Sequence, residues 1–243
     1  MADVVVIVPT YNEIESLEKI VRRIRSAVPD ADLLVVDDAS PDGTGELADR
    51  LAAADPAISV LHRTEKNGLG QAYLAGFAEA RRGGYDFVVE IDADGSHDPA
   101  ELPTMITLAR GGAHLVIGSR WVPGGQVRNW PWLRQLISRS GNTYSRIALR
   151  SRIHDITAGY RVFRTSALEW LDRADVSSQG YCFQVEVAWR IEQAGLIVVE
   201  HPITFVEREN GESKMHFGIV AEALWRVTTW GVGVRLKSPR PRS

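Results

Sequence analysis

Short, continuous apolar runs alternate along the chain with longer segments in which apolar residues recur at helical spacing. The run at 4–8 is followed by helically spaced apolar positions over 14–28, where Asn12 is the expected N-cap and Pro29 the expected stop. A continuous apolar run predicts a strand buried on both faces. The alternation therefore predicts an α/β fold, with a Rossmann-like, mostly parallel sheet and helices on both faces.

The alternation continues regularly to about residue 117. Further strands are expected at 33–36, 58–61, 87–91 and 114–117, and further helices at 45–54, 70–82 and 99–110. From Trp121 onward Trp, Arg and Gly become frequent, but no Gly/Ser-rich or Pro-rich linker separates this part. We therefore expect a single domain over residues 1–236, followed by a disordered basic tail at 237–243.

Polar clusters follow three of the expected strands at the point where each strand ends. They are 9–13, 37–42 and 92–97. Ligands of an open parallel sheet bind outside the carboxyl ends of its strands, so we expect the clusters to meet along one edge. Mg²⁺ and Mn²⁺ take carboxylate oxygens, with substrate phosphates in other positions, and Asp92 and Asp94 suit that role. Asp38 and Glu13 are then available for hydrogen bonds to the base and ribose of a nucleotide, and the Tyr11 ring could stack on that base.

Purely structural roles are the alternative explanation for these acidic residues. An isolated Asp-x-Asp is common by chance, and an acid after a strand often caps a helix or forms a turn. We interpret Asp42 and Asp98 in that structural way because each lies in a Pro/Gly turn context. The loop at 66–70 lacks the third glycine of the dinucleotide fingerprint and the Gly-Lys-Ser/Thr ending of a P-loop. Its glycines are expected to allow a tight turn and close helix packing.

The stretch from Leu102 to His154 contains no Asp or Glu but carries eight arginines. An arginine's planar fork suits phosphate, so this asymmetry predicts an anionic partner. Arg134 and Ser138 lie four apart on an expected helix and, with Arg120, could hold an acceptor phosphate. Three further arginines, at 146, 150 and 152, are interpreted as a solvated face. Interleaved tryptophans favour contact with a membrane surface.

Composition narrows the partners and the compartment. With 28 Lys+Arg against 31 Asp+Glu the net charge is -3, and no nucleic-acid-binding module is recognisable, so no nucleic-acid partner is expected. The one cysteine, Cys182, fits a reducing compartment and is expected to be buried. The sequence shows neither a signal peptide nor a long apolar span. We expect a cytoplasmic protein that associates peripherally with the cytoplasmic face of the membrane.

The ordered set of motifs resembles dolichol-phosphate mannose synthases and their bacterial polyprenol-phosphate counterparts, a branch of the family-2 glycosyltransferases. The resemblance covers roughly residues 4–230. It rests on Val8-Pro9-Thr10-Tyr11-Asn12-Glu13, the segment 36–44, Asp92-Ala93-Asp94-Gly95-Ser96-His97-Asp98-Pro99, Gly118-Ser119-Arg120 and Gly211-Glu212-Ser213-Lys214. Segments 155–161 and 180–186 also look like family segments, without a clear role.

The resemblance implies a GT-A fold and an inverting transfer of mannose from GDP-mannose to a polyprenyl (dolichyl-type) monophosphate, with Mg²⁺ or Mn²⁺ as cofactor. It implies donor contacts from Pro9, Tyr11, Glu13, Val36, Asp38, Asp92, Ala93, Asp94, Arg208 and Lys214. It puts Asp92 and Asp94 at the metal, and Arg120 and Arg134 at the acceptor phosphate, where the spacing argument adds Ser138. The implied catalytic residues are Asp94, Arg120 and Arg134. A separate membrane-protein partner is also expected, by analogy with some actinobacterial systems.

Three alternatives remain open at this stage. The same fold could transfer glucose from UDP-glucose to polyprenyl phosphate. A polysaccharide-extending enzyme would need a general base aimed at a neutral hydroxyl, for which Asp155 and Glu186 are candidates. The third alternative is a nucleotide-binding regulator with a degenerate site. The intact acids of this sequence and the pair Arg208 and Lys214 argue against it.

Overall fold

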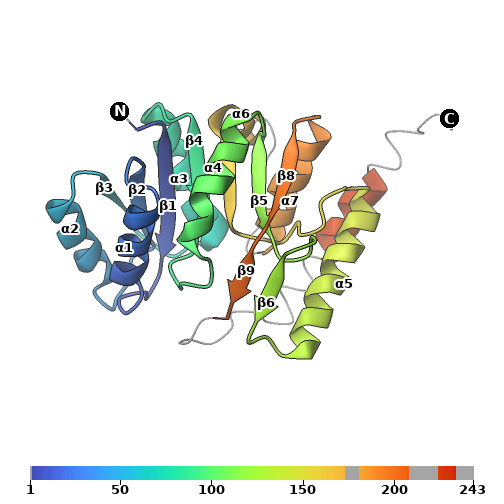
Figure 1. Ribbon diagram of the computed structural model, residues 1–243, viewed down its shortest axis with the longest axis horizontal. Helices are drawn as coiled ribbons and strands as arrows, with labels where there is room; N and C mark the ends of the chain where they lie inside the picture. The colour runs from blue at the N-terminus through green and yellow to red at the C-terminus, as the bar shows by residue number, and fades with distance from the viewer. Residues whose placement is uncertain (1, 173–180, 208–223, 234–243) are drawn as a thin grey trace.

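The computed structural model describes residues 2–172, 181–207 and 224–233, and the structural statements below concern these residues. A seven-stranded sheet has the order β3-β2-β1-β4-β7-β5-β8. Its strands are β1 (Val4–Thr10), β2 (Asp32–Asp37), β3 (Ile58–His62), β4 (Phe87–Glu90), β5 (Leu115–Ser119), β7 (Arg161–Arg164) and β8 (Val198–Pro202). The predicted mostly parallel α/β fold is confirmed (Figure 1).

Helices cover both faces of this sheet. They are α1 (Leu17–Ala27), α2 (Thr44–Ala54), α3 (Leu69–Arg82), the 3-10 turn η1 (Pro99–Glu101), α4 (Leu102–Arg110), α5 (Trp132–Leu149), α6 (Thr165–Asp172) and α7 (Tyr181–Gln193). Alternate β1 side chains serve the two faces, since Val6 packs with α1 and α4 whereas Ile7 packs with α3 and α7. Strand β1 is therefore apolar and buried from Val4 to Pro9, which explains the continuous apolar run in the sequence.

Strand β7 runs antiparallel to both of its neighbours, β4 and β5. The residues that precede β7 consequently lie at the same edge of the sheet as the residues that follow β1, β2, β4 and β5. Beyond that edge a second, two-stranded sheet pairs β6 (Gln126–Arg128) with β9 (Thr204–Val206). In Figure 1 this small sheet extends below the carboxyl ends of β5 and β8, beside α5. Neither feature follows from the regular strand–helix alternation.

The start of the first helix is a correction to the prediction. Asn12 does not cap α1, because α1 begins at Leu17 with Ser16 at the N-cap position. Asn12 instead has φ 58°, in the left-handed region that asparagine tolerates, so the chain turns there before the helix. Ile14, predicted to belong to the helix, is 41% exposed. The other element boundaries before residue 117 fall within two residues of the prediction, apart from the 99–110 helix, whose first turn is η1.

Glycines in the loop before α3 have the expected effects. Gly68 has φ +92°, a backbone conformation that side chains disfavour, and it precedes the first residue of α3. A Cβ at Gly70 would come within 2.9 Å of the Phe183 ring on α7, so the two helices pack closely only because this residue is glycine. Cys182, also on α7, is 2% exposed, as predicted.

Candidate functional site

The ends of β1 and β2 are joined by hydrogen bonds around Asp37. This carboxylate accepts from the Thr10 hydroxyl at 3.1 Å and from the Ser40 hydroxyl and backbone N–H at 2.6 and 3.1 Å. The next residue, Asp38, is 4% exposed and forms an ion pair with Arg63, which follows β3. Burial raises the pKa of Asp38 above its ordinary value, although the charge and hydrogen bond of Arg63 oppose the shift. Two of the expected acid clusters thus meet at one edge.

The other residues assigned to the nucleotide line the same edge. Pro9 and Val36 are buried near the ends of β1 and β2 and lie side by side in the strand register. Tyr11 is partly exposed, and the Lys66 ammonium lies 3.6 Å from the centre of its ring. The Glu13 carboxylate accepts a hydrogen bond from the Ser16 hydroxyl at 2.6 Å, at the start of α1. Their contacts with a nucleotide remain a prediction.

Asp92 and Asp94 follow β4 at the centre of this edge. Each is partly buried. The Tyr73 hydroxyl donates to Asp92 at 3.2 Å, and the Ser96 backbone N–H donates to Asp94 at 3.0 Å. Two adjacent carboxylates at a strand end fit a hard divalent cation. No group of three or more metal-ligating side chains occurs among the described residues, so such a cation would need oxygen ligands from elsewhere, as a diphosphate supplies.

Asp42 and Asp98 have the structural roles predicted for them. Asp42 accepts hydrogen bonds from the Thr44 hydroxyl at 2.6 Å and backbone N–H at 3.0 Å, at the start of α2. Asp98 caps η1 by accepting from the Ala100 N–H at 3.0 Å. The hydrogen bonds of Asp42 hold the pKa of its carboxyl below the ordinary value despite some burial.

The loop before β7 is held rigidly at this edge by groups from three directions. Arg161, fully buried at the start of β7, donates to the carbonyls of Ala158 at 2.7 Å and Ile156 at 2.9 Å. From β8, the Glu200 carboxylate accepts from the backbone N–H groups of His154 at 2.8 Å and Asp155 at 2.9 Å. The third direction is Arg120, which follows β5. The loop therefore presents Asp155 and Thr157 in a fixed orientation.

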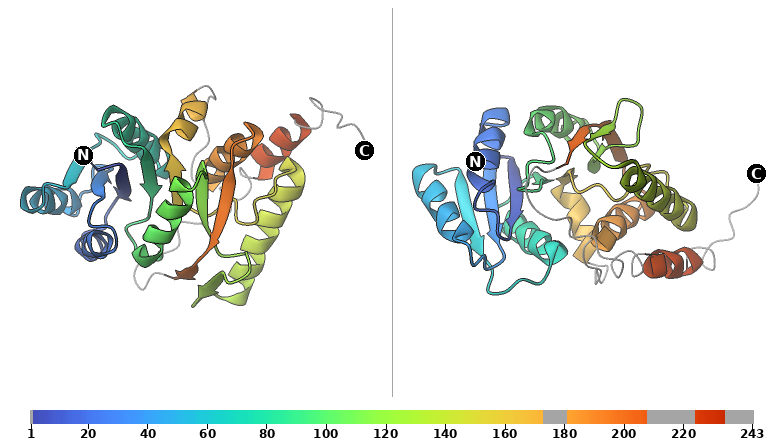
Figure 2. Two further views of the ribbon diagram at one scale, coloured as in Figure 1. Left: turned by 45° about the horizontal axis from the view of Figure 1, so that its top comes forward. Right: turned by 90° about the horizontal axis from the view of Figure 1, so that it is seen from below.

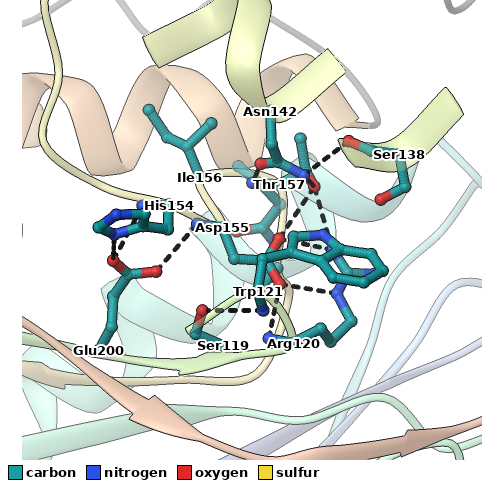
Figure 3. Close-up of polar contacts among 12 residues, drawn as sticks. Ser119, Arg120, Trp121, Ser138, Asn142, His154, Asp155, Ile156, Thr157 and Glu200 are labelled. Atoms are coloured by element: carbon teal, nitrogen blue, oxygen red, sulfur yellow. Dashed lines mark hydrogen bonds and ion pairs between the residues drawn. The ribbon is translucent and has the colours of Figure 1, made fainter. Parts of the chain in front are cut away.

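Arg120 and Asp155 form a two-pronged ion pair in the interior (Figure 3). Arg120 Nε and Nη2 donate to the two Asp155 carboxylate oxygens at 2.7 Å each, and the Arg120 backbone N–H adds a third bond at 2.9 Å. Asp155 is 0% exposed and Arg120 9% exposed. A carboxylate so placed serves as the counter-ion of Arg120 and is poorly placed to act as a general base. Glu186, the other candidate base, is 1% exposed and pairs with Arg190.

Arg134, on the first turn of α5, is paired with Glu207, but both side chains remain about a quarter exposed, at 26% and 28%. The guanidinium carbon of Arg134 lies 4.3 Å from the centre of the Trp130 ring, and that of Arg120 lies 5.5 Å from the same ring. The structure thus brings together the two arginines that the sequence assigns to an acceptor phosphate. Ser138 lies one turn further along α5 and its carbonyl accepts from Asn142 at 3.0 Å.

A chain of aromatic rings connects these arginines with the loop that carries Asp94. Trp130 contacts Phe205, Phe205 contacts His97, and His97 contacts Tyr160, with ring centres 5.3, 5.1 and 5.0 Å apart. His97 is 4% exposed, and burial lowers the pKa of its ring to about 4, with Asp94 opposing and Arg120 assisting the shift. The backbone N–H of Val206 also donates to the Ser96 carbonyl at 3.1 Å. The two halves of the site are therefore one packed unit.

Several site residues were not identified from the sequence. Arg63 could have been suspected because it follows a strand, as the expected acids do. Thr157 lies in the 155–161 segment that resembles the family without a clear role, and Asn142 and Glu207 give no comparable signal, since their partners lie 15 and 73 residues away. Arg208 and Lys214, assigned to the donor, lie outside the described residues, as does the 237–243 tail.

Comparison with known proteins identifies the family. A sequence profile described as glycosyl transferase family 2 matches residues 5–171, more than half of the chain. The chain belongs to glycosyl transferase family 2. This family-2 enzyme is 56% identical over 236 residues to the polyprenol monophosphomannose synthase of Mycolicibacterium smegmatis, covering 97% of the chain and 89% of the relative. It is 55% identical over 239 residues to the undecaprenyl-phosphate mannosyltransferase of Micrococcus luteus, covering 98% of each.

A third relative is more distant and longer than this glycosyltransferase. The dolichol-phosphate mannosyltransferase of Pyrococcus furiosus is 38% identical over 230 residues, covering 93% of the chain but 63% of the relative. Among solved structures, a mannosyltransferase from Pyrobaculum calidifontis in complex with GDP-Man and Mn²⁺ matches with TM-score 0.63 and 20% identity, covering 98% of this chain and 65% of that one. Glucosyl-3-phosphoglycerate synthase from Mycobacterium tuberculosis, in complex with UDP, matches with TM-score 0.65 and 19% identity, covering 98% and 81%. These structural likenesses support the GT-A fold.

Proposed function

We propose that this glycosyltransferase moves mannose from GDP-mannose to a polyprenyl monophosphate and gives polyprenyl-phosphate mannose. The observation that carries the proposal is the convergence of Arg120 and Arg134 on one Trp130 ring, joined through packed aromatic side chains to the loop of Asp94. Such a pair of guanidinium groups suits a phosphate acceptor beside a diphosphate leaving group. The names of the two bacterial relatives support the same acceptor class and sugar.

In the proposed mechanism the donor diphosphate lies against Asp92 and Asp94, with the nucleotide along the ends of β1 and β2. Mg²⁺ or Mn²⁺ held by these two carboxylates would supply Lewis-acid stabilisation of the leaving diphosphate. Asp38, Tyr11 and Glu13 would orient the nucleoside. The residues present fit the cation, because both supply carboxylate oxygens, and the Tyr73 hydroxyl and the Ser96 N–H help to orient these carboxylates.

The acceptor needs no strong general base in this proposal. A phosphate monoester is anionic at neutral pH, so its oxygen can attack the anomeric carbon directly and invert the configuration. Arg120 and Arg134 would hold the phosphate, with Ser138 adding a hydroxyl from the next turn of α5. The burial and pairing of Asp155 agree with this, because a base for a neutral sugar hydroxyl would have to reach its substrate.

Contact with a membrane surface is part of the proposal. Helix α5 exposes Trp132, Leu133, Leu136 and Ile147, and helical residues 224–233 pack beside it, as Figure 2 shows. A Cβ at Gly231 would approach the Ala148 carbonyl to 2.6 Å, so the two helices are in close contact. Apolar side chains interleaved with arginines suit an anionic lipid surface. None of the helices within the described residues is long and apolar enough to span a membrane.

One transfer assay tests the function. Purified protein is incubated with labelled GDP-mannose or UDP-glucose, a short polyprenyl phosphate, and Mg²⁺, Mn²⁺ or EDTA, and the lipid product is extracted and counted. We expect label in the lipid only with GDP-mannose and a divalent metal. Transfer from UDP-glucose instead would replace the donor assignment. Transfer to a soluble sugar acceptor, or to nothing, would overturn the proposed reaction.

Vesicle sedimentation tests the membrane contact separately. Binding to vesicles containing anionic lipid is expected to fall in Leu136→Glu, on the exposed face of α5. Ile14→Glu is the matched control, because Ile14 is also an exposed apolar residue, 41% against 52% for Leu136, but lies before α1. Equal binding by both variants would contradict the assignment, and binding only to membranes that retain their proteins would indicate a membrane-protein partner.

A further inference from the structure

The hydroxyl of Thr157 occupies the junction between the two elements that carry the acceptor residues. It accepts a hydrogen bond from Arg120 Nη2 at 3.1 Å and another from Asn142 Nδ2 at 3.1 Å. It donates to Asp155 Oδ1 at 3.3 Å. A hydroxyl has one donor and two acceptor positions, so these three bonds use its full capacity. Figure 3 shows this hydroxyl between the Arg120–Asp155 pair and α5.

Asn142 completes the connection to α5. Its side-chain oxygen accepts from the Thr157 backbone N–H at 3.2 Å, so the amide and Thr157 are joined by two bonds in opposite directions. The same amide nitrogen donates to the Ser138 carbonyl at 3.0 Å. Asn142 is 2% exposed, and a buried amide satisfied at both ends is held in one orientation.

We propose that Thr157 is a positioning residue that fixes the Arg120 guanidinium relative to Ser138, so that the two act as one preformed cradle for the acceptor phosphate. This inference rests on the proposed function, since it concerns the same acceptor. Arg120 directly follows β5, whereas Ser138 lies on α5, 18 residues further along the chain. The Asp155 carboxylate fixes one edge of the guanidinium. Thr157 and Asn142 transmit that fixed position to the helix.

A preformed cradle has a kinetic consequence. Phosphate-binding groups that are already in position lose little conformational entropy when the acceptor binds, so loosening them weakens acceptor binding selectively. The hydrogen bonds of Thr157 go to Arg120, Asn142 and Asp155, which lie at the proposed acceptor side. A change at Thr157 should therefore raise the KM for the acceptor and leave the KM for GDP-mannose close to its original value.

The decisive comparison is Thr157→Val against Thr157→Ser, because valine keeps the shape without the hydroxyl and serine keeps the hydroxyl. We expect Thr157→Val to lower kcat/KM for a short polyprenyl phosphate by about tenfold or more, with the KM for GDP-mannose within about twofold. Thr157→Ser should stay within about threefold of wild type. Thr165→Val is the control, since Thr165 also donates from a partly buried hydroxyl, to the Tyr85 carbonyl at 2.6 Å, at the opposite edge of the sheet.

The Arg120→Lys background tests whether Thr157 acts through Arg120. Lysine cannot serve Asp155 and Thr157 together with a planar fork, so Thr157→Val should add little further loss of kcat/KM in that background. Fully multiplicative losses would show that Thr157 acts independently of Arg120 and would overturn the inference. Equal kinetics of the valine and wild-type proteins, a serine variant as weak as the valine variant, or an equal rise in both KM values would overturn it as well.

A binding measurement separates this inference from the proposed reaction. With saturating GDP and Mn²⁺, inorganic phosphate should raise the thermal unfolding temperature of the wild type and Thr157→Ser more than that of Thr157→Val. If this difference is found but no sugar reaches a lipid phosphate, the phosphate cradle stands and the proposed reaction fails. If the lipid is mannosylated and neither phosphate stabilisation nor kinetics distinguishes valine from serine, the reaction stands and the role of Thr157 fails.

Discussion

The two ion pairs formed by Arg120 and Arg134 at the proposed acceptor site differ in burial and in how readily they can exchange partners. Arg120 and Asp155 are joined by three bonds in the interior, with the carboxylate 0% exposed. Arg134 and Glu207 are about a quarter exposed, and Arg134 rests on the Trp130 ring. A buried pair cannot lose a partner without leaving an uncompensated charge, whereas an exposed pair exchanges partners readily. The first pair is therefore a fixed part of the fold, and the second is suited to exchange its carboxylate for a substrate anion.

The largest effect should follow from breaking the buried pair. Asp155→Ala leaves the Arg120 guanidinium without its counter-ion, and we expect a loss of about 3–5 kcal/mol in the free energy of unfolding. Urea denaturation measures it. Asp3→Ala is the control, because Arg110 and Asp3 are 53% and 43% exposed and their pair should contribute less than about 1 kcal/mol. If Asp155→Ala lowers the free energy of unfolding as little as Asp3→Ala does, the burial of the Arg120–Asp155 pair does not affect its contribution to stability.

Removing the exposed arginine should affect binding rather than stability. Arg134→Ala is expected to raise the KM for polyprenyl phosphate by about 30-fold, because a charge-assisted hydrogen bond is worth about 2 kcal/mol. GDP binding, measured by calorimetry, and the unfolding free energy should change little. Arg120→Ala should instead lower turnover and stability together, since it also strands Asp155. Unchanged acceptor kinetics in both variants would remove the phosphate assignment.

The buried region around Arg120, which includes His97, should also make the free energy of unfolding depend on pH. Burial lowers the pKa of His97 to about 4, below the ordinary value of 6.5 that applies when the chain is unfolded. At this residue the unfolded chain binds more protons between these values, so the contribution of His97 to stability is lost as pH falls from about 6.5 toward 4. Between about pH 7 and pH 5 this loss should be about 2 kcal/mol. It is measured as the difference between wild type and His97→Phe by denaturation at each pH, because burial raises the pKa of Glu90 to about 8 and the contribution of that carboxyl has the opposite sign. A difference between the two proteins that does not change with pH would contradict the assignment.

The smallest effect should come from the exchangeable carboxylate and should have the opposite sign. Glu207→Gln removes the anion that competes with the acceptor for Arg134, so the KM for polyprenyl phosphate should fall by about threefold. The difference from wild type should shrink at high salt, since both partners are partly exposed. Initial rates at two salt concentrations measure this. A raised KM would mean that Glu207 assists the acceptor and that the pair is not exchanged.

The donor end could be predicted from the sequence much better than the acceptor end. Strands β1 to β4 and their helices repeat one local unit, and an acid after a strand end must lie at the carboxyl edge of a parallel sheet. That reasoning locates Asp38, Asp92 and Asp94 without knowledge of their contacts. The early error at Asn12 is local, since a left-handed residue and a helix N-cap share the same sequence preference.

At the acceptor end the determining contacts are long-range. Arg120 meets Asp155 across 35 residues, and Arg134 meets Glu207 across 73. The sequence shows an arginine excess there but gives no information on which arginines are neutralised by carboxylates. The reversed direction of β7 could not be predicted either, because nothing in its four residues, Arg-Val-Phe-Arg, indicates which way the strand runs. The arginine excess, on which the predicted phosphate binding rests, is therefore visible in the sequence, whereas the geometry of the pairs is not.

The reversal of β7 also places the two proposed substrate sites on separate parts of the chain. Since β7 enters the sheet from the carboxyl edge, the loop before it and the segment after β5 form the proposed acceptor side without using any residue of β1 to β3. Insertions or substitutions in the 120–160 region can remodel the acceptor while the nucleotide-facing strand ends stay intact. Related enzymes could in this way change their acceptor and keep the same sugar donor. Chimeras that exchange this region between relatives should therefore retain their original donor preference.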